Sequence, residues 1–383
     1  MRQIYLDHAA TTPLHPSVLA AMLEVLEGPP ANPSSVHAFG RRARARVTAA
    51  RDSLAERLGC RAEQLVFTSG GTESDNLALL GTAAAMRGRG RRHIVTSAIE
   101  HHAVLHTCER LEREGFDVTR VQPDAQGIIH AEQVAAALRP DTGLVSVMMV
   151  NNELGTIQPI ADIGERVRAA GVVMHVDAVQ ALGKLPLDLR KLPVDLLSLS
   201  AHKINGPQGV GVLYVAPRTS LHSQLLGGTQ ERGRRAGTEN VAGIVGMARA
   251  LELAEAGREA AWQHAQLLQR TLLERLAERD DIEYAINGAD AERVPHIVNL
   301  RLRGVGTESL LMNLDLEGVA AASGSACSSG SLRTSHVLQA IGMPELGASA
   351  AVRVSFGIGN TVEEIEYAAD KLATICARIR TTH

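Results

Sequence analysis

The sequence has few aromatic residues, and its charge is close to balanced. Of its 383 residues, only four are Phe, four Tyr and one Trp. A planar ligand would therefore be covered more readily by another flat side chain, such as histidine. The formal net charge is -3 and the sequence pI is about 6.6. This composition gives no reason to expect binding to nucleic acid or to an anionic membrane.

Long apolar runs and clustered cysteines are also missing. No segment approaches the roughly 20 consecutive apolar residues of a membrane-spanning helix, and the first residues have no signal-peptide pattern. The four cysteines, Cys60, Cys108, Cys327 and Cys376, are too far apart for a CxxC-type metal site or a disulfide framework. We therefore expect reduced thiols, no metal site and a cytoplasmic protein.

The order of apolar runs and helical patterns predicts an α/β fold. Apolar runs of strand length occur at residues 64–68, 93–97, 144–150, 172–176, 196–199 and 210–215, with helical patterns between them. Such runs are typical of strands buried on both faces of a mainly parallel sheet flanked by helices. Two further runs, at 296–302 and 352–356, predict a smaller α+β domain. The predicted bounds are 15–250 for the large domain, with 1–14 and 251–383 forming the small one.

Polar residues follow these runs, at the sheet edge where ligands of such folds bind. Lys203 is one of only four lysines and directly follows a buried run. An amine there can form an imine with a carbonyl group, although a surface lysine is the simpler reading of the residue alone. Asp177 ends another run and could face a pyridine nitrogen, or cap a helix. Together they favour a site for pyridoxal 5'-phosphate (PLP).

A phosphate-binding turn is also predicted. Gly71 and Thr72 follow the first run, where backbone N–H groups at a helix start and a hydroxyl group could hold a phosphate. Taken alone, this Gly-Gly-Thr turn is more often a plain connection between a strand and a helix. Ser200 and His202, beside Lys203, could donate to the same phosphate.

With these residues in place, the chain resembles the cysteine desulfurases of the NifS/IscS type, within the class V aminotransferase-like PLP enzymes of fold type I. The matching segments run in family order along the chain: YLDHAATTP (5–13), NPSS (32–35), TSGGTESDN (68–76), EHHAV (100–104), VNNELG (150–155), HVDAVQ (175–180), SAHK (200–203), GGTQERG (227–233), RAGTEN (235–240) and SGSAC (323–327). The resemblance implies conversion of L-cysteine to L-alanine with transfer of the sulfur atom.

The resemblance also implies roles for individual residues. Lys203 would bind PLP covalently, Asp177 would face its pyridine nitrogen, Gln180 its phenolic oxygen, and His101 would stack on the ring and exchange protons. The other implied cofactor contacts are Gly71, Thr72, Ser200, His202, Asn152 and, reaching in from the second subunit of a homodimer, Thr238. The implied substrate contacts are Asn152, Asn32 and Arg353, the last by a two-pronged bond to the carboxylate.

Cys327 lies in a run of small polar residues, 322–331, which predicts a mobile loop. A structural thiol is more common in an apolar run, so we interpret Cys327 as the nucleophile that receives the sulfur as a persulfide. The sequence does not indicate which neighbour activates this thiol.

Several alternatives stay open at this stage. The same scaffold supports aminotransferases, which need no mobile cysteine, and selenocysteine lyases, which the same residues could serve. A catalytically inactive sulfur-relay partner is a further alternative, which the presence of Lys203, Asp177, His101 and Cys327 disfavours. The acceptor of the sulfur could be an iron-sulfur scaffold protein or another sulfur carrier. Scaffold-assembly members of the family often have a C-terminal tail that contacts the iron-sulfur scaffold protein, whereas this chain ends soon after its last helical pattern. Docking to such a scaffold protein is therefore in doubt.

Overall fold

The computed structural model describes residues 3–324, 335–343 and 349–380. Its main element is a seven-stranded sheet in the order β2-β8-β7-β6-β5-β3-β4. Only β8 runs antiparallel to its neighbours β2 and β7. The strands are β2 (Leu65–Thr68), β3 (His93–Ser97), β4 (Asp117–Val121), β5 (Thr142–Ser146), β6 (Val173–Asp177), β7 (Leu196–Ser200) and β8 (Gly211–Val215). The predicted mainly parallel sheet is thereby confirmed.

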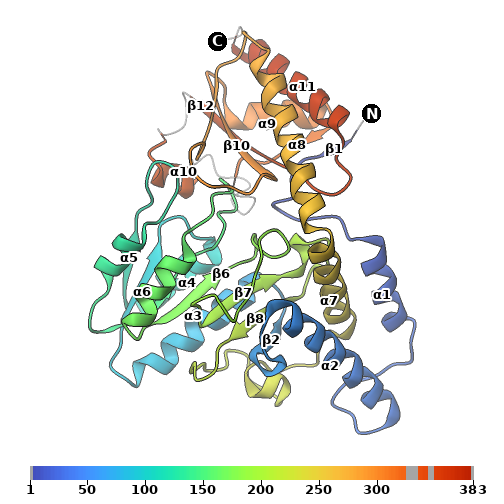
Figure 1. Cartoon of the computed structure of the whole chain (residues 1–383), viewed down its shortest axis with the longest axis vertical. Helices are drawn as coiled ribbons and strands as arrows, with labels where there is room; N and C mark the ends of the chain where they lie inside the picture. The colour runs from blue at the N-terminus through green and yellow to red at the C-terminus, as the bar shows by residue number, and fades with distance from the viewer. Residues whose placement is uncertain (1–2, 325–334, 344–348, 381–383) are drawn as a thin grey trace.

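Helices cover both faces of this sheet, as Figure 1 shows. Alternate strand residues point to opposite faces: Val66 and Leu196 pack in one apolar cluster, whereas Phe67 and Leu197 pack in the other. The first cluster includes residues of α3 (Gly71–Arg87) and α4 (His102–Arg113). The second includes residues of α2 (Ala38–Leu58), α5 (Ala131–Ala137), α6 (Ile160–Ala169) and α7 (Val241–Ala256).

A third apolar cluster lies around a smaller antiparallel sheet, drawn above the main sheet in Figure 1. Its strand order is β12-β10-β9, formed by β9 (Tyr284–Ile286), β10 (Ile297–Arg303) and β12 (Ser349–Ser355). Beside it, β1 (Ile4–Tyr5) pairs with β11 (Val319–Ala320). The helices here are α8 (Arg258–Ala277), α9 (Thr307–Leu316) and α11 (Val362–Arg380). The short helix α10 (His336–Ala340) packs in the second cluster of the main sheet instead. The bounds of the two domains stay a prediction.

Two details of the sheet differ from the sequence-based expectation. The run at 144–150 extends beyond β5, which ends at Ser146. The backbone after Ser146 still forms a hydrogen bond with the neighbouring strand β6, from Met149 N to Asp177 O at 2.8 Å. Strand β4 was not expected, because it lies at the sheet edge and its residues 117–120 are exposed or half-buried. None of the helices in the described ranges has the length and apolarity needed to cross a membrane.

Candidate active site

A cavity of about 260 Å³ opens at the ends of the parallel strands, and we call it the sheet-edge cavity. Because parallel strands end at the same edge, residues far apart in the chain meet here. Asp177 ends β6, Ser200 ends β7, and Lys203 closes the short turn that follows β7. The lining includes ten residues that the sequence singles out: Gly71, Thr72, His101, Asn152, Asp177, Gln180, Ser200, His202, Lys203 and Arg353.

Three predicted residues are not placed in this cavity. Asn32 is exposed, and its Oδ1 accepts a bond from Ser34 N at 2.8 Å. Thr238 is also exposed, on the segment that follows the short helix Gln230–Gly233. Cys327 lies outside the described residues. Their roles stay predictions.

Lys203 and Gln180 are held by the N-terminal segment of the chain. Lys203 Nζ donates to the carbonyl oxygens of Ala9 and Ala10, both at 2.6 Å. Gln180 Nε2 donates to the same Ala9 oxygen at 2.9 Å. Residues 9 and 10 therefore position the amine beyond the carboxyl end of β7, which explains why the motif at 5–13 belongs to the site.

The carboxylate of Asp177 is buried beside a second carboxylate that the sequence analysis did not single out. Asp177 is 7% exposed and accepts a bond from Val179 N at 2.9 Å; burial raises its pKa to about 6. Asp75, on α3, is 1% exposed and also lines the cavity. Burial, and then the charge of Asp177, raise the pKa of Asp75 well above its usual value. The charge of one carboxylate therefore disfavours ionisation of the other.

His175 lies behind these acids and fixes the hydroxyl groups around them. It is fully buried, and its Nε2 lies 2.9 Å from Ser198 Oγ and 3.6 Å from Asp75 Oδ1. Its Nδ1 lies 2.8 Å from Ser146 Oγ. Burial lowers the pKa of His175 to about 3, so it is neutral at physiological pH.

His101 is the N-cap of α4, and its Nδ1 accepts a bond from Ala103 N at 3.1 Å. A neutral imidazole that accepts at Nδ1 carries its proton on Nε2. Burial, and then the charge of Lys203, lower the pKa of His101 to about 4. His101 thus caps a helix and lines the cavity, and its stacking on PLP stays a prediction.

The start of α3 is suited to hold a phosphate group. Gly70 takes φ 153°, a conformation that favours glycine, and makes no side-chain cap bond. A Cβ at Gly71 would lie 2.7 Å from Val179 Cγ2, so only glycine fits there. Ser200 Oγ is buried without a hydrogen-bond partner in the described part of the chain. The first N–H groups of the helix and this hydroxyl group are therefore donors that a phosphate would satisfy.

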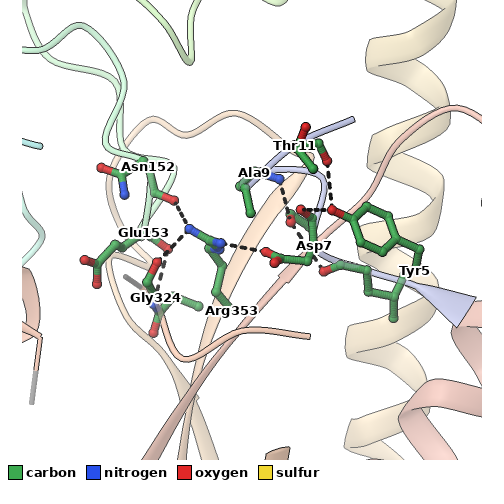
Figure 2. Close-up of polar contacts among 12 residues, drawn as sticks. Tyr5, Asp7, Ala9, Thr11, Asn152, Glu153, Gly324 and Arg353 are labelled. Carbon is green, nitrogen blue, oxygen red and sulfur yellow. Dashed lines mark hydrogen bonds and ion pairs between the residues drawn. The ribbon is translucent and has the colours of Figure 1, made fainter. Parts of the chain in front are cut away.

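Arg353 closes the opposite side of the cavity and is 1% exposed. Its Nη2 donates to Asp7 Oδ1 at 2.6 Å, and its Nη1 donates to the carbonyl oxygens of Asn152 at 2.9 Å and Gly324 at 2.7 Å (Figure 2). The Asn152 amide points away from the guanidinium group (Figure 2). Among the described residues Arg353 Nε has no hydrogen-bond partner.

Glu153 lies next to Arg353 and was also missed by the sequence analysis. It is 1% exposed, and burial raises its pKa to about 7. Ser335 Oγ donates to its Oε2 at 2.6 Å. A Cβ at Gly324 would collide with the same Oε2. Glu153 therefore contacts the residues on both sides of the segment 325–334, which carries Cys327.

Glu100, directly before His101, is a third missed acid. It accepts bonds from Ser97 Oγ at 2.5 Å and Met148 N at 2.9 Å, and burial raises its pKa to about 8. The signal for these acids was their position in polar motifs after apolar runs. Their burial depends on packing that no local pattern describes.

Replacing Glu100 with glutamine is expected to change how stability depends on pH. A raised folded-state pKa means that the folded protein keeps a proton between about pH 4.5 and about pH 8 that the unfolded chain has lost. Stability therefore falls as pH rises through this window, by at most roughly 1.4 kcal/mol per pH unit. Glutamine cannot ionise, so the variant should gain on the parent as pH rises. Urea unfolding at several pH values measures this.

The exposed Glu308 on α9 offers a matched control, because Glu308→Gln should leave the pH dependence unchanged. A constant difference between parent and Glu100→Gln across the window would show that Glu100 ionises normally.

Comparison with known proteins agrees with this geometry. The family model for aminotransferase class V matches residues 4–368. The putative cysteine desulfurase IscS 1 of Bacillus subtilis (strain 168) is 47% identical over 380 residues, covering 99% of this chain and all of the relative. A solved NifS-like protein is 36% identical with a TM-score of 0.90, covering 98% of this chain and 99% of that one. A structure described as SspA in complex with cysteine is 37% identical with a TM-score of 0.82, covering 92% and 99%.

These matches extend over nearly the whole chain, and they bring with them the cofactor of the family. The residues of the cavity fit PLP. Asp177 suits the nitrogen of its ring, Lys203 suits its aldehyde group, and Ser200 with the start of α3 suits its phosphate group. The chain therefore belongs to the class V aminotransferase family, and within it to the PLP-dependent cysteine desulfurases of the NifS/IscS type.

Proposed function

We propose that this chain takes sulfur from L-cysteine at the sheet-edge cavity, with Lys203 as the PLP-binding base and Cys327 as the sulfur carrier. The observation that carries the proposal is that Lys203, Asp177, His101 and Arg353 line one cavity. A relative solved in complex with cysteine supports the choice of substrate. When bound, PLP supplies an electron sink for the negative charge at the substrate Cα.

The residues of the chain would share the remaining work. Lys203 Nζ is the base at the substrate Cα, and the ionised Asp177 keeps a facing pyridine nitrogen protonated. His101 holds a proton at Nε2, which it can pass to the reacting substrate. The Cys327 thiolate attacks the substrate sulfur: the new Sγ–S bond forms and the S–Cβ bond breaks, leaving its electron pair on Cβ. Cβ then takes up a proton, and the carbon skeleton leaves as alanine.

Arg353 would bind the substrate carboxylate. The proposed two-pronged bond requires Asp7 to yield part of the guanidinium group, because Nη2 is paired with that carboxylate at 2.6 Å. Arg353 Nε, which lacks a partner among the described residues, would supply the second prong. Substrate binding would thus compete with Asp7.

The spectrum of the purified protein tests this function directly. A near-visible absorption band of lysine-bound PLP should change when L-cysteine is added, with alanine and sulfide appearing in equal amounts in the presence of a reductant. A protein that PLP leaves colourless would refute the cofactor site. A coloured protein that does not react with cysteine would favour another substrate, such as selenocysteine. The values of kcat/KM for selenocysteine and for cysteine would then be compared.

We also propose a cytoplasmic homodimer that delivers sulfur to an acceptor protein, such as an iron-sulfur scaffold or a sulfur carrier. Val36, four residues after Asn32, is 85% exposed. Leu226 is 89% exposed, and the adjacent Leu225 carbonyl oxygen accepts a bond from Ala236 N, two residues before Thr238. Burial of these apolar side chains between subunits would favour a dimer. Free thiols at Cys60 and Cys108 suit a reducing compartment. Light scattering gives the oligomeric state.

Glu153→Gln is expected to slow sulfur transfer with little change in KM. The carboxylate anchors Ser335, and a hydrogen bond to a charged acceptor is stronger than one to a neutral amide, so we expect a loss of about tenfold in kcat. Ionisation of Glu153 near pH 7 should also make parent kcat rise through that pH. The variant should lack this rise. Sulfide release measured against pH checks both effects.

Glu308→Gln again serves as the control and should keep the parental profile. If Glu153→Gln retained both the rate and the rise near pH 7, Glu153 would have no part in positioning the ends of the segment 325–334.

A further inference from the structure

A second cavity, separate from the sheet-edge cavity, lies where the first turns of α8 meet the ends of the small sheet, and we call it the α8 cavity. It has a volume of about 60 Å³, and its lining comes from α8 and from loops that adjoin strands of the main sheet and of the small sheet. Lys184 comes from the chain that follows β6, His296 directly precedes β10, and Phe356 directly follows β12. Arg258 and Trp262 come from α8, which Figure 1 shows beside the small sheet. No residue lines both cavities.

The α8 cavity carries positive charge that the described residues do not balance. No ion pair or hydrogen bond of the Lys184 amine or the Arg258 guanidinium group is found among them, and no Asp or Glu lines the cavity. Burial lowers the pKa of Lys184. Burial, and then the charge of Lys184, lower the pKa of both His296, which lines the cavity, and His8.

An unbalanced cation in a half-buried position is costly, and the cavity that Lys184 lines also has Arg258 but no carboxylate in its lining. His296 is 6% exposed and neutral, because burial lowers its pKa well below the usual range. It adds an uncharged hydrogen-bonding group but no counter-charge. An anion from solution would neutralise the site.

The walls restrict the kind of anion. Most of the surface is apolar, supplied by side chains such as Trp262, Phe356 and Ile358. Ile358 is 60% exposed, so the cavity opens to solvent beside it. One water needs roughly 10–15 Å³ in this measure of volume, so there is room for a ligand of a few heavy atoms. A phosphate ion would leave several oxygens against apolar walls. An amino acid would bring its ammonium group against two cations.

We propose that the α8 cavity binds a small monocarboxylate with a short apolar chain, its carboxylate between Lys184 and Arg258 and its chain against Trp262 and Phe356. Such a ligand satisfies the cations and fills the apolar part of the cavity. The cavity lies between loops of the main sheet and loops of the small sheet, so it exists only in the folded protein. A bound carboxylate would therefore also stabilise the folded protein.

Trp262 is the only tryptophan in the sequence, so its fluorescence reports on this cavity alone. The test titrates the holoenzyme with butyrate at a fixed ionic strength. We expect a saturable change in emission with butyrate and none with butyramide, which has the same shape without the charge. Lys184→Met should weaken butyrate binding about 30-fold or more, since it removes one partner of a buried charge pair. Lys191→Met is the matched control, because Lys191 has a side chain that is 83% exposed, and it should bind like the parent.

Arg258→Gln gives a second variant in case Lys184→Met folds poorly, and the PLP absorption band of each variant reports whether its fold is intact. Weaker butyrate binding in a folded Arg258→Gln protein supports the proposal. The proposal is overturned if butyrate gives no saturable change, if butyramide matches it, if inorganic phosphate binds more tightly, or if folded Lys184→Met and Arg258→Gln proteins bind like the parent.

Discussion

Lys203→Ala is expected to lower alanine formation from L-cysteine by at least about a thousandfold, since proton transfer by a positioned side chain contributes up to roughly four orders of magnitude. The variant loses the amine to which we assign both PLP binding and the removal of the proton at the substrate Cα. Borohydride, which fixes PLP to its lysine, should no longer attach the cofactor covalently. Mass spectrometry of the treated protein, together with an alanine assay, measures both losses.

Lys191→Ala provides the lysine control, because Lys191 is exposed and pairs weakly with Asp188 at 3.7 Å. It should keep the parental rate and the covalent label. Covalent PLP on a Lys203→Ala protein would place the cofactor on another lysine and end the assignment of the site.

Cys327→Ala is expected to separate cofactor chemistry from sulfur transfer. The variant should bind PLP and change its spectrum on addition of L-cysteine, because the cavity residues Lys203 and Asp177 are intact. Sulfide release should fall by at least about a hundredfold, since no thiol can take the sulfur. Spectra and sulfide assays on the same sample measure the two effects.

Other thiols provide the controls for this result. Cys60 is half-buried, and burial raises its pKa to about 12, whereas Cys108 is fully buried with a similar shift. Such thiols are poor nucleophiles at neutral pH. Cys60→Ala should therefore keep the parental rate, and a Cys327→Ala protein that still released sulfide at that rate would rule out Cys327 as carrier.

The sequence indicated the part of the site that depends on strand order. Asp177, Ser200 and Lys203 each follow an apolar run, and the ends of parallel strands meet at one edge, so their convergence follows from the alternation of strands and helices. The fold class followed from the same runs. Strand β4 escaped prediction because an edge strand need not be apolar on both faces.

The buried acids could not be found in the same way. Asp75 is on the second turn of α3, and whether that turn faces the sheet or the solvent depends on how the helix packs. Glu153 contacts Ser335, 182 positions away, and Asp7 contacts Arg353, 346 positions away. Local periodicity contains no information on such contacts. Thr238 differs again, since its predicted contact with the site of a second subunit does not form within one chain, and Asn32 stays a predicted substrate contact.

The contact between Arg353 and Asp7 has a consequence for the order of events during synthesis. The two residues are 346 positions apart, and Arg353 also binds the carbonyl oxygens of Asn152 and Gly324. A ribosome that makes the chain from its N-terminus produces Asp7, Lys203 and Asp177 long before Arg353. The proposed cofactor residues are thus made well before the proposed substrate contact at Arg353. Cysteine binding through Arg353 would therefore begin only when translation is nearly complete.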